Sequence, residues 1–243
     1  MIYFFSSKID IRGPHFSTLV TGCAKTLPWG RFKTSITSGV SEIDTDYAFS
    51  PGDQVHFSPT EMDRSQHESK IVNNTDFQNV KLNSPFKFSH SAADGIFYKS
   101  VSNVVIRGST EEGSENFGGR ILSRGQLIAI GVKFQNFAQR GFSSPNDYRS
   151  ALNLKSNSIV KFCIFENIHN TGIYATDAQN VNIYGNLIVD GVEDGFRISG
   201  NIQNFTIISN VVMNIRHRLI QPVLSTQGNK GFRIWPSAFR LKY

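Results

Sequence analysis

The chain has 243 residues, and its 25 Lys and Arg against 19 Asp and Glu give a formal net charge of +6. This charge favours acidic partners such as uronic-acid glycans, nucleic acid or anionic lipid. No Lys/Arg run is dense enough for a nucleic-acid-binding arm, and no apolar run approaches the roughly 18–20 residues of a membrane-spanning helix. We therefore expect neither nucleic-acid binding nor membrane insertion. The two cysteines, Cys23 and Cys163, are too few for a disulfide framework or a Cys-based zinc site.

The first 50 residues carry no sequence period and are predicted to form an N-terminal cap segment. Residues 1–5 read Met-Ile-Tyr-Phe-Phe, which suits a first strand. This run is too short for the apolar region of a signal peptide and has no basic residues before it, so no signal peptide is visible. At residues 49–57, Phe-Ser-Pro-Gly-Asp-Gln-Val-His-Phe places a Pro-Gly turn before an alternating strand.

Similar segments then recur along the chain at a nearly constant step. The matches are 132–142 with 163–173 at a shift of 31 residues, 160–174 with 183–197 at 23, and 180–188 with 204–212 at 24. The step from Gly95 to Asn103 equals the step from Gly172 to Asn180, which ties an earlier segment to the later ones. A repeat of this length, with short alternating runs and Asn or Gly at the corners, predicts a stacked solenoid over residues 51–221.

Each repeat is predicted to point its apolar residues inward. In the run at 195–199, for example, Phe196 and Ile198 face the interior and Arg197 faces solvent. Runs of about 3–5 residues cannot form a stable sheet alone, so successive repeats must stack into long parallel sheets. Corner residues are expected to form two hydrogen-bonded columns. The first column contains Asn136, Asn167 and Asp190, and the second contains Asn103, Asn180 and Asn204. Cys163 falls at the inward position of Asn186 and Asn210 and is predicted to fill the core.

These features resemble the right-handed parallel β-helix superfamily of pectate lyases, polygalacturonases and related repeat proteins. The resemblance covers residues 95–221. It extends toward residue 50 because Pro28-Trp29 followed by the Pro-Gly-Asp-x-Val-x-Phe motif at 51–57 is similar to the N-terminal segment of many secreted, carbohydrate-active β-helix proteins. The fold implied is a single-stranded right-handed parallel β-helix of about 23 residues per turn. Residues 222–243 lose the period and are expected to be an irregular tail, a cap, or the place where the chain is a truncated piece of a longer protein.

Aligning the repeats predicts a polar column on the outward face of one strand. Its members are Asn153, Tyr174, Arg197 and Gln221. The turn that leads into this strand adds Glu193 and Asp194, and one repeat later His217 and Arg218. The insertion at 143–150 is expected to protrude beside this site and contributes Arg149. Such a set supplies charged groups that can bind carboxylates and groups that can transfer protons.

The segment at 193–198, Glu-Asp-Gly-Phe-Arg-Ile, resembles two family signatures. Asp194-Gly195 is similar to the end of the Asn-Thr-Asp-Gly segment of polygalacturonases, but the Asp-Asp pair that this family has one turn later is replaced by His217 and Arg218. Gly195-Phe-Arg-Ile198 is similar to the Gly-Ile-Arg-Ile strand of alginate-lyase-like β-helices, which implies that Arg197 neutralises a uronate. No Lys stands at a neighbouring column position to act as the base.

The residues therefore predict a secreted or cell-surface protein that acts on an acidic polysaccharide, with Asp194, Arg197 and His217 as catalytic candidates. The substrate-binding candidates are Glu193, Tyr174, Asn153, Arg149 and Arg218. Lyase and hydrolase chemistry remain alternatives, as do a non-catalytic glycan-binding, adhesin-like or tailspike-like module and an inactive fragment. His169 and His217 are two repeats apart, roughly 10 Å, which is too far to share a metal ion. No metal site is predicted, and a calcium cofactor is left open because no ligand set identifies one.

Overall fold

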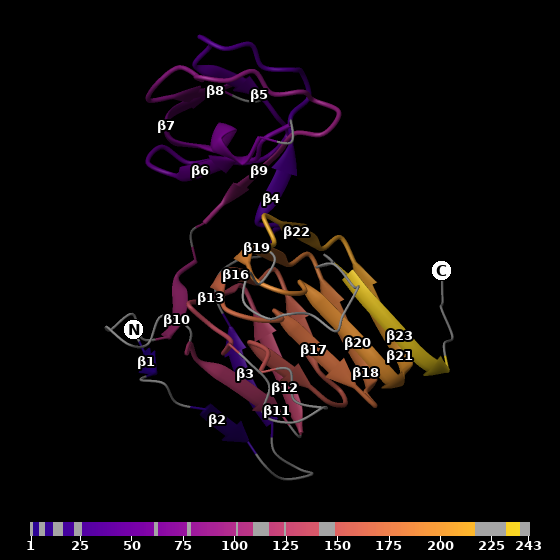
Figure 1. Cartoon of the computed structure of the whole chain (residues 1–243). Coiled ribbons are helices and arrows are strands. Elements are labelled where there is room, and N and C mark those ends of the chain that lie inside the picture. The colour runs from indigo at the N-terminus through magenta and orange to yellow at the C-terminus, as the bar shows by residue number, and fades with distance from the viewer. Residues whose placement is uncertain are drawn as a thin grey trace. The chain divides into compact units, whose positions relative to one another are not determined.

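The computed structural model describes residues 2–4, 8–11, 17–21, 26–60, 63–76, 79–100, 102–108, 117–123, 125–140, 149–216 and 232–238. The chain forms two compact units, one built from Met1–Thr26 with Ser102–Tyr243 and the other from Leu27–Val101 (Figure 1). Over the described ranges the structure consists of strands and turns with a single short 3-10 helix, η1 (Arg64–Gln66). No helix in these ranges has the length and apolar character to cross a membrane.

The first unit is a parallel β-solenoid, and its described strands form three sheets that we call A, B and C. Sheet A contains β1 (Ile2–Phe4), β10 (Val104–Gly108), β13 (Val132–Gln135), β16 (Ile164–Ile168), β19 (Leu187–Gly191) and β22 (Val211–Met213), in this order. Sheet B contains β2 (Lys8–Ile11), β11 (Arg120–Ser123), β14 (Leu152–Leu154), β17 (Ile173–Thr176), β20 (Phe196–Asn201) and β23 (Phe232–Ala238). Sheet C contains β3 (Ser17–Thr21), β12 (Gln126–Ile130), β15 (Ile159–Lys161), β18 (Gln179–Tyr184) and β21 (Gln203–Ile208). The predicted parallel β-helix is confirmed.

The first turn of this solenoid comes from the N-terminal residues. β1, β2 and β3 pair in parallel with β10, β11 and β12, so that Ile2 lies opposite Ile106 and Ile9 opposite Ile121 (Figure 1). The chain completes one turn, leaves to form the whole of Leu27–Val101, and returns at β10. The predicted cap at residues 1–50 and the predicted start of the solenoid at residue 51 are therefore wrong. Partners separated by an entire second unit leave no period in the sequence.

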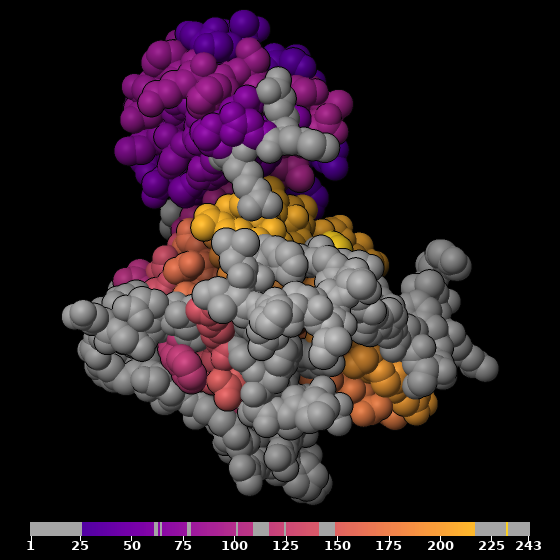
Figure 2. Space-filling model, in the orientation of Figure 1, coloured from indigo at the N-terminus to yellow at the C-terminus, as the bar shows by residue number. Residues whose placement is uncertain are grey.

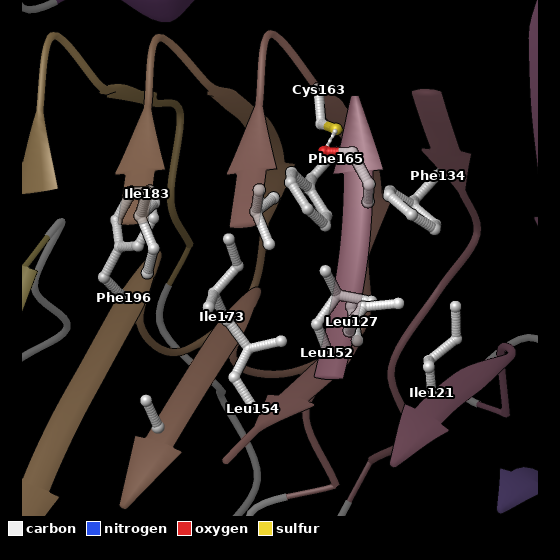
Figure 3. Packing of buried hydrophobic residues seen from close by; sticks show 14 of the residues in the cluster. Ile121, Leu127, Phe134, Leu152, Leu154, Cys163, Phe165, Ile173, Ile183 and Phe196 are labelled. Carbon is white, nitrogen blue, oxygen red and sulfur yellow. Dashed lines mark hydrogen bonds between the residues drawn. The ribbon is translucent and has the colours of Figure 1, made fainter. Parts of the chain in front are cut away.

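The repeat register over the later turns is confirmed. Phe134 lies opposite Phe165, Val160 opposite Ile183, and Ile183 opposite Ile207. These side chains meet in one continuous core, in which the rings of Phe134 and Phe165 stack at 5.0 Å between centroids (Figure 3). Each fully buried side chain of this kind contributes about 1.5–3 kcal/mol relative to an exposed one, which is why the stacked turns are stable although the single strands are short.

One predicted corner column is confirmed and the other is partly wrong. Asn136, Asn167 and Asp190 all have a left-handed backbone, and Asn167 Nδ2 donates to Asn136 Oδ1 at 2.6 Å. In the second column Asn204 Nδ2 donates to Asn180 Oδ1 at 2.8 Å, and Asn180 Nδ2 donates to Asn157 Oδ1 at 3.0 Å. Asn157 therefore takes the place predicted for Asn103. Asn103 directly precedes β10, which belongs to sheet A, whereas Asn180 belongs to sheet C.

A third column lies inside the solenoid, at the turn from sheet C to sheet A. Asn186 Nδ2 donates to the Val160 carbonyl oxygen at 2.8 Å, and its Oδ1 accepts from the Cys163 amide at 2.9 Å. Asn210 Nδ2 repeats the first contact one turn later, on the Ile183 carbonyl at 2.9 Å. The Cys163 thiol occupies the same place one turn earlier and donates to the Ala129 carbonyl at 3.4 Å. The predicted core role of Cys163 is confirmed, and burial raises the pKa of its thiol to about 12.

The second unit, Leu27–Val101, is an antiparallel sheet. Its described strands are β4 (Trp29–Arg31), β5 (Glu42–Asp44), β6 (Gln54–Phe57), β7 (Glu68–Asp76), β8 (Asn79–Leu82) and β9 (Ile96–Lys99), in the order β4-β9-β6-β7-β8-β5. Phe32, Phe57, Phe86 and Phe97 are buried in its core, and the space-filling view shows the unit as a rounded body (Figure 2). The predicted strand in residues 51–57 is confirmed as β6. The proposed early repeat at Gly95 is wrong, because β9 pairs antiparallel with β4 and β6.

A buried charged cluster lies in this second unit. Glu68 is 6% exposed, pairs with Lys70 Nζ at 2.7 Å, and accepts hydrogen bonds from the backbone amides of Lys87 and Phe88 at 3.0 Å. Burial by itself raises the pKa of Glu68, but the hydrogen bonds from Lys70, Lys87 and Phe88 outweigh it and lower the pKa below its ordinary value of 4.5. These contacts satisfy the carboxylate internally, which is the arrangement expected of a structural charge.

Candidate functional site

The predicted polar column lies on the outward face of sheet B. Asn153 in β14 stands opposite Tyr174 in β17, and Tyr174 stands opposite Arg197 in β20. This part of the column is confirmed. The next position belongs to Arg233 in β23, whereas Gln221, which was predicted there, lies outside the described residues. The column therefore continues through a strand that the sequence period did not reveal.

The exposure predicted for this column is wrong for its two largest members. Tyr174 is 2% exposed and Arg197 8% exposed, whereas Asn153 is half-buried. Alternation along a strand distinguishes an inward from an outward face, but it does not tell whether the outward face is covered. A sugar ring therefore cannot stack on Tyr174 in this arrangement.

Asp194 and Arg197 form a buried ion pair. Arg197 Nε donates to Asp194 Oδ2 at 2.8 Å, and the Asp194 side chain is fully enclosed. Asp194 lies in the turn before β20 and Arg197 lies in β20, so the pair ties the turn to the strand. Removing one partner from such a pair costs about 3–5 kcal/mol, because the other charge is left buried and unpaired. The geometry thus gives Asp194 and Arg197 a positioning role.

Backbone hydrogen bonds bring the turns of successive repeats together at the edge of sheet B. The Ala151 amide donates to the Thr171 carbonyl at 2.9 Å, and the Gly172 amide donates to the Asp194 carbonyl at 3.0 Å. In each of these turns the preceding residue stacks in the same way, and these residues are Arg149, Asn170 and Glu193. Asn170 is 1% exposed and donates from Nδ2 to the Gln139 carbonyl at 2.7 Å, whereas Arg149 and Glu193 are half-buried.

Arg149 is held at this edge by local contacts. Its backbone is left-handed, with φ of 47°, and its Nη1 donates to the Arg140 carbonyl at 2.9 Å. Its guanidinium lies over the Phe117 ring, 5.7 Å from the centroid, which is within the range of a cation–π contact. The structure thus brings Arg149, Glu193 and Asn153 to the same edge, as predicted. The remainder of the predicted insertion, together with His217 and Arg218, lies outside the described residues.

His169 adds a titratable group to this edge. It directly precedes Asn170, is half-buried, and its amide donates to the Phe137 carbonyl at 2.9 Å. Burial lowers the pKa of His169 below its ordinary value of 6.5, so the imidazole is neutral at pH 7. A neutral imidazole can accept a proton. Within the described part of the chain, no group of three or more His, Cys, Asp or Glu side chains is arranged to hold a metal ion.

A second polar group, which the prediction missed, lies on the outward face of sheet A. It consists of Arg107, Lys133, Gln135 and Glu166, and we call it the sheet A polar group. Arg107 stands opposite Gln135, and Gln135 stands opposite Glu166. Lys133 forms an ion pair with Glu166, and Gln135 Nε2 donates to Glu166 Oε2 at 2.9 Å. The alternation around Lys133 and Gln135 marks both as outward. Arg107 was missed because residues 103–106 were aligned with sheet C.

The comparison with protein families assigns the solenoid. A family model described as a right-handed β-helix region matches residues 94–231, which is more than half of the chain. The chain belongs to the right-handed β-helix family. The solenoid is therefore right-handed, as predicted. No curated protein matches the chain.

Solved structures similar to this β-helix chain include three bacteriophage tailspikes. Tailspike gp61 of Pseudomonas phage phi297 is 12% identical, with 88% of this chain and 36% of that chain covered and a TM-score of 0.28. Tailspike protein gp49 of Pseudomonas phage LKA1 is 12% identical, with 80% and 42% covered and a TM-score of 0.28. The Gp54 tailspike of Acinetobacter baumannii bacteriophage AP22, solved in complex with A. baumannii capsular saccharide, is 9% identical, with 86% and 52% covered and a TM-score of 0.29. The chain thus spans 36–52% of the length of these tailspikes.

Proposed function

We propose that this chain is part of an extracellular or cell-surface protein that binds an acidic polysaccharide along the flank of its β-helix. The observation that carries the proposal is the polar edge of sheet B, where Arg149 and Asn153 belong to one turn, Glu193 lies two turns later, and all three side chains are half-buried. Neighbouring strands are about 4.8 Å apart, so Glu193 lies about 10 Å along the solenoid axis from the turn that holds Arg149 and Asn153. Such a surface suits an extended polymer, and the net charge of +6 attracts an acidic one.

The chemistry of the edge residues gives each a role. Arg149 would pair with a uronate carboxylate, because a guanidinium binds a carboxylate through charge-assisted hydrogen bonds. Asn153 and Glu193 would bind sugar hydroxyls. The Asp194–Arg197 pair would hold the turn in place for them. His217 and Arg218 stay predicted members of this site.

Binding is favoured over hydrolysis at this edge. A glycoside hydrolase needs two carboxyl groups that flank the scissile bond. Asp194 is enclosed and paired with Arg197, which leaves Glu193 as the half-buried carboxylate of this turn. A buried carboxylate that neutralises an arginine supports the fold instead of protonating a leaving group.

A uronate lyase is the second candidate, and His169 is the observation that favours it. In β-elimination a base removes the proton from C5, next to the uronate carboxylate, and a C4–C5 double bond forms. The C4–O bond breaks with its electron pair on the glycosidic oxygen, which takes a proton from solvent. His169 is neutral at pH 7 because burial lowers its pKa, so it can act as that base. Incubation with polygalacturonate and alginate should then raise the absorbance of unsaturated uronate, and His169→Ala should abolish the increase. A wild-type chain that binds these polymers without any increase would exclude this candidate.

The binding proposal is tested on an array of uronate-bearing and neutral polysaccharides. The wild-type chain should bind uronate-bearing polymers, and Glu193→Gln should weaken binding about tenfold, the effect of losing about 1.4 kcal/mol from a hydrogen bond to a charged group. Asn153→Ala should weaken it by a smaller factor. Glu42→Gln is the matched control, because Glu42 is an exposed carboxylate in the second unit. Unchanged binding by both site variants would refute the site, and no binding to any uronate polymer would refute the function.

A further inference from the structure

The sheet A polar group is a local interruption of an otherwise apolar face. Glu166 is followed in its column by Val189 and then Met213, and Lys133 is followed by Ile164 and then Leu187. Ile164, Leu187 and Val189 are each at most 2% exposed although they point away from the core. Charged and amide side chains are therefore confined to the earlier turns of this face. If the whole face were exposed to solvent, polar side chains would be expected in its later turns as well.

Two atoms of the sheet A polar group are buried without a hydrogen-bond partner. They are Arg107 Nε, which is a donor, and Gln135 Oε1, which is an acceptor. The two residues are half-buried and stand opposite each other on neighbouring strands, β10 and β13. Buried polar groups in folded proteins are nearly always satisfied by protein, ordered water or a bound ligand. Arg107 Nε and Gln135 Oε1 are thus a donor and an acceptor on neighbouring strands that the described protein atoms leave unsatisfied.

The charges of the group define the sign of a bound partner. Lys133 and Glu166 neutralise each other in their ion pair, so the guanidinium of Arg107 leaves the group with one positive charge. The other amide contact of Gln135 is already used, since its Nε2 donates to Glu166 Oε2 at 2.9 Å. The group therefore offers a cationic donor at Arg107 and a neutral acceptor at Gln135.

We propose that Arg107 and Gln135 form a binding subsite for an acidic sugar unit on the outward face of sheet A. The sugar carboxylate accepts from Arg107, and a sugar hydroxyl donates to Gln135 Oε1. The Lys133–Glu166 ion pair and the bond from Gln135 to Glu166 hold the amide in the orientation that leaves Oε1 available. This subsite is separate from the sheet B edge, and it rests on the proposed function in that both take an acidic polysaccharide.

The test measures binding of the full chain to immobilised polygalacturonate and alginate, each beside its carboxyl-reduced form. The acidic polymers should bind at least about tenfold more tightly than the reduced ones, because a charge-assisted hydrogen bond is lost on reduction. Arg107→Lys keeps the charge but removes the Nε donor and should weaken binding about tenfold. Gln135→Met keeps the side-chain length and should weaken it similarly. Arg31→Lys, at an exposed arginine of the second unit, is the matched control and should bind as the wild type does.

A measurement on the unaltered chain guards against variants that fold poorly. The Arg107 Nε–H resonance of the isotope-labelled protein should shift on addition of galacturonate and stay in place on addition of galactose. Wild-type binding that is unchanged in Arg107→Lys and Gln135→Met would overturn the subsite and leave the sheet B proposal standing. An unmoved Nε–H resonance would mean that ordered water alone satisfies these atoms and would also overturn it. Failure of the wild-type chain to bind either polymer would overturn both proposals.

Discussion

Replacement of Asn186 by alanine tests the column inside the solenoid. The Asn186 side chain is fully buried, and it satisfies the Val160 carbonyl at 2.8 Å and the Cys163 amide at 2.9 Å. Alanine leaves the Cys163 amide in the core without a partner, whereas the Val160 carbonyl still lies in the ladder between β15 and β18. An unsatisfied buried group costs about 1–3 kcal/mol, so the free energy of unfolding should fall by about 1–3 kcal/mol. Water that enters the vacated space would bring the loss toward the lower end of this range.

Urea denaturation followed by far-UV circular dichroism measures this loss. Hydrogen exchange of the Cys163 amide provides a local readout, because this amide donates to Asn186 Oδ1 and should lose protection in the variant. Asn201→Ala is the matched control, since Asn201 is an exposed asparagine in the same unit, and its effect should stay within about 0.5 kcal/mol. A loss below about 1 kcal/mol for Asn186→Ala, with the Cys163 amide still protected, would refute the idea that the amide column stabilises the stacked turns.

Three further predictions concern other buried groups. Cys163→Asn should be at least as stable to urea as the wild type, because the new amide can donate to the Ala129 carbonyl as the thiol does, whereas Cys163→Ala should be less stable. The wild-type thiol has its pKa raised to about 12, so it should resist iodoacetamide at mildly alkaline pH until the chain unfolds. Asp194→Ala and Arg197→Met should each cost about 3–5 kcal/mol in urea denaturation, and the double variant should recover much of the loss; additive losses would contradict the ion pair. The stabilisation from Glu68 should be complete above its unfolded pKa near 4.5 and should be lost as the pH falls through the lower folded pKa. Glu68→Gln should therefore reduce the fall in the free energy of unfolding at acidic pH, and an unchanged fall would contradict this.

The stacked turns between residues 132 and 216 could be predicted from the sequence. Each turn repeats the same residue types at the same corners, as Asn136, Asn167 and Asp190 do. The left-handed backbone at these corners and the need to bury alternating apolar residues are local requirements, so they leave a readable pattern. The same pattern identified the register that places Asn153, Tyr174 and Arg197 in one column.

The candidate site was predicted in position but not in exposure. The alternation correctly placed Tyr174 and Arg197 on the outward face of sheet B, yet both are buried. Arg107 was not predicted at all, because its neighbours Val104 and Ile106 suit any of the three sheets equally well. Exposure and sheet membership depend on what packs against a strand, and a short alternating run carries no information on its partner.

By itself, the sequence determined the type of fold, the repeat length and the inward residues of the later turns. Only the tertiary structure decided that β1, β2 and β3 form the first turn, that Leu27–Val101 is a separate antiparallel unit, and that Asp194 is paired with Arg197. The physical reason is that a sequence repeat reflects contacts between residues at equivalent positions in successive turns. Pairing across an inserted unit, and the burial of an outward face, arise from contacts between residues that are far apart in the sequence.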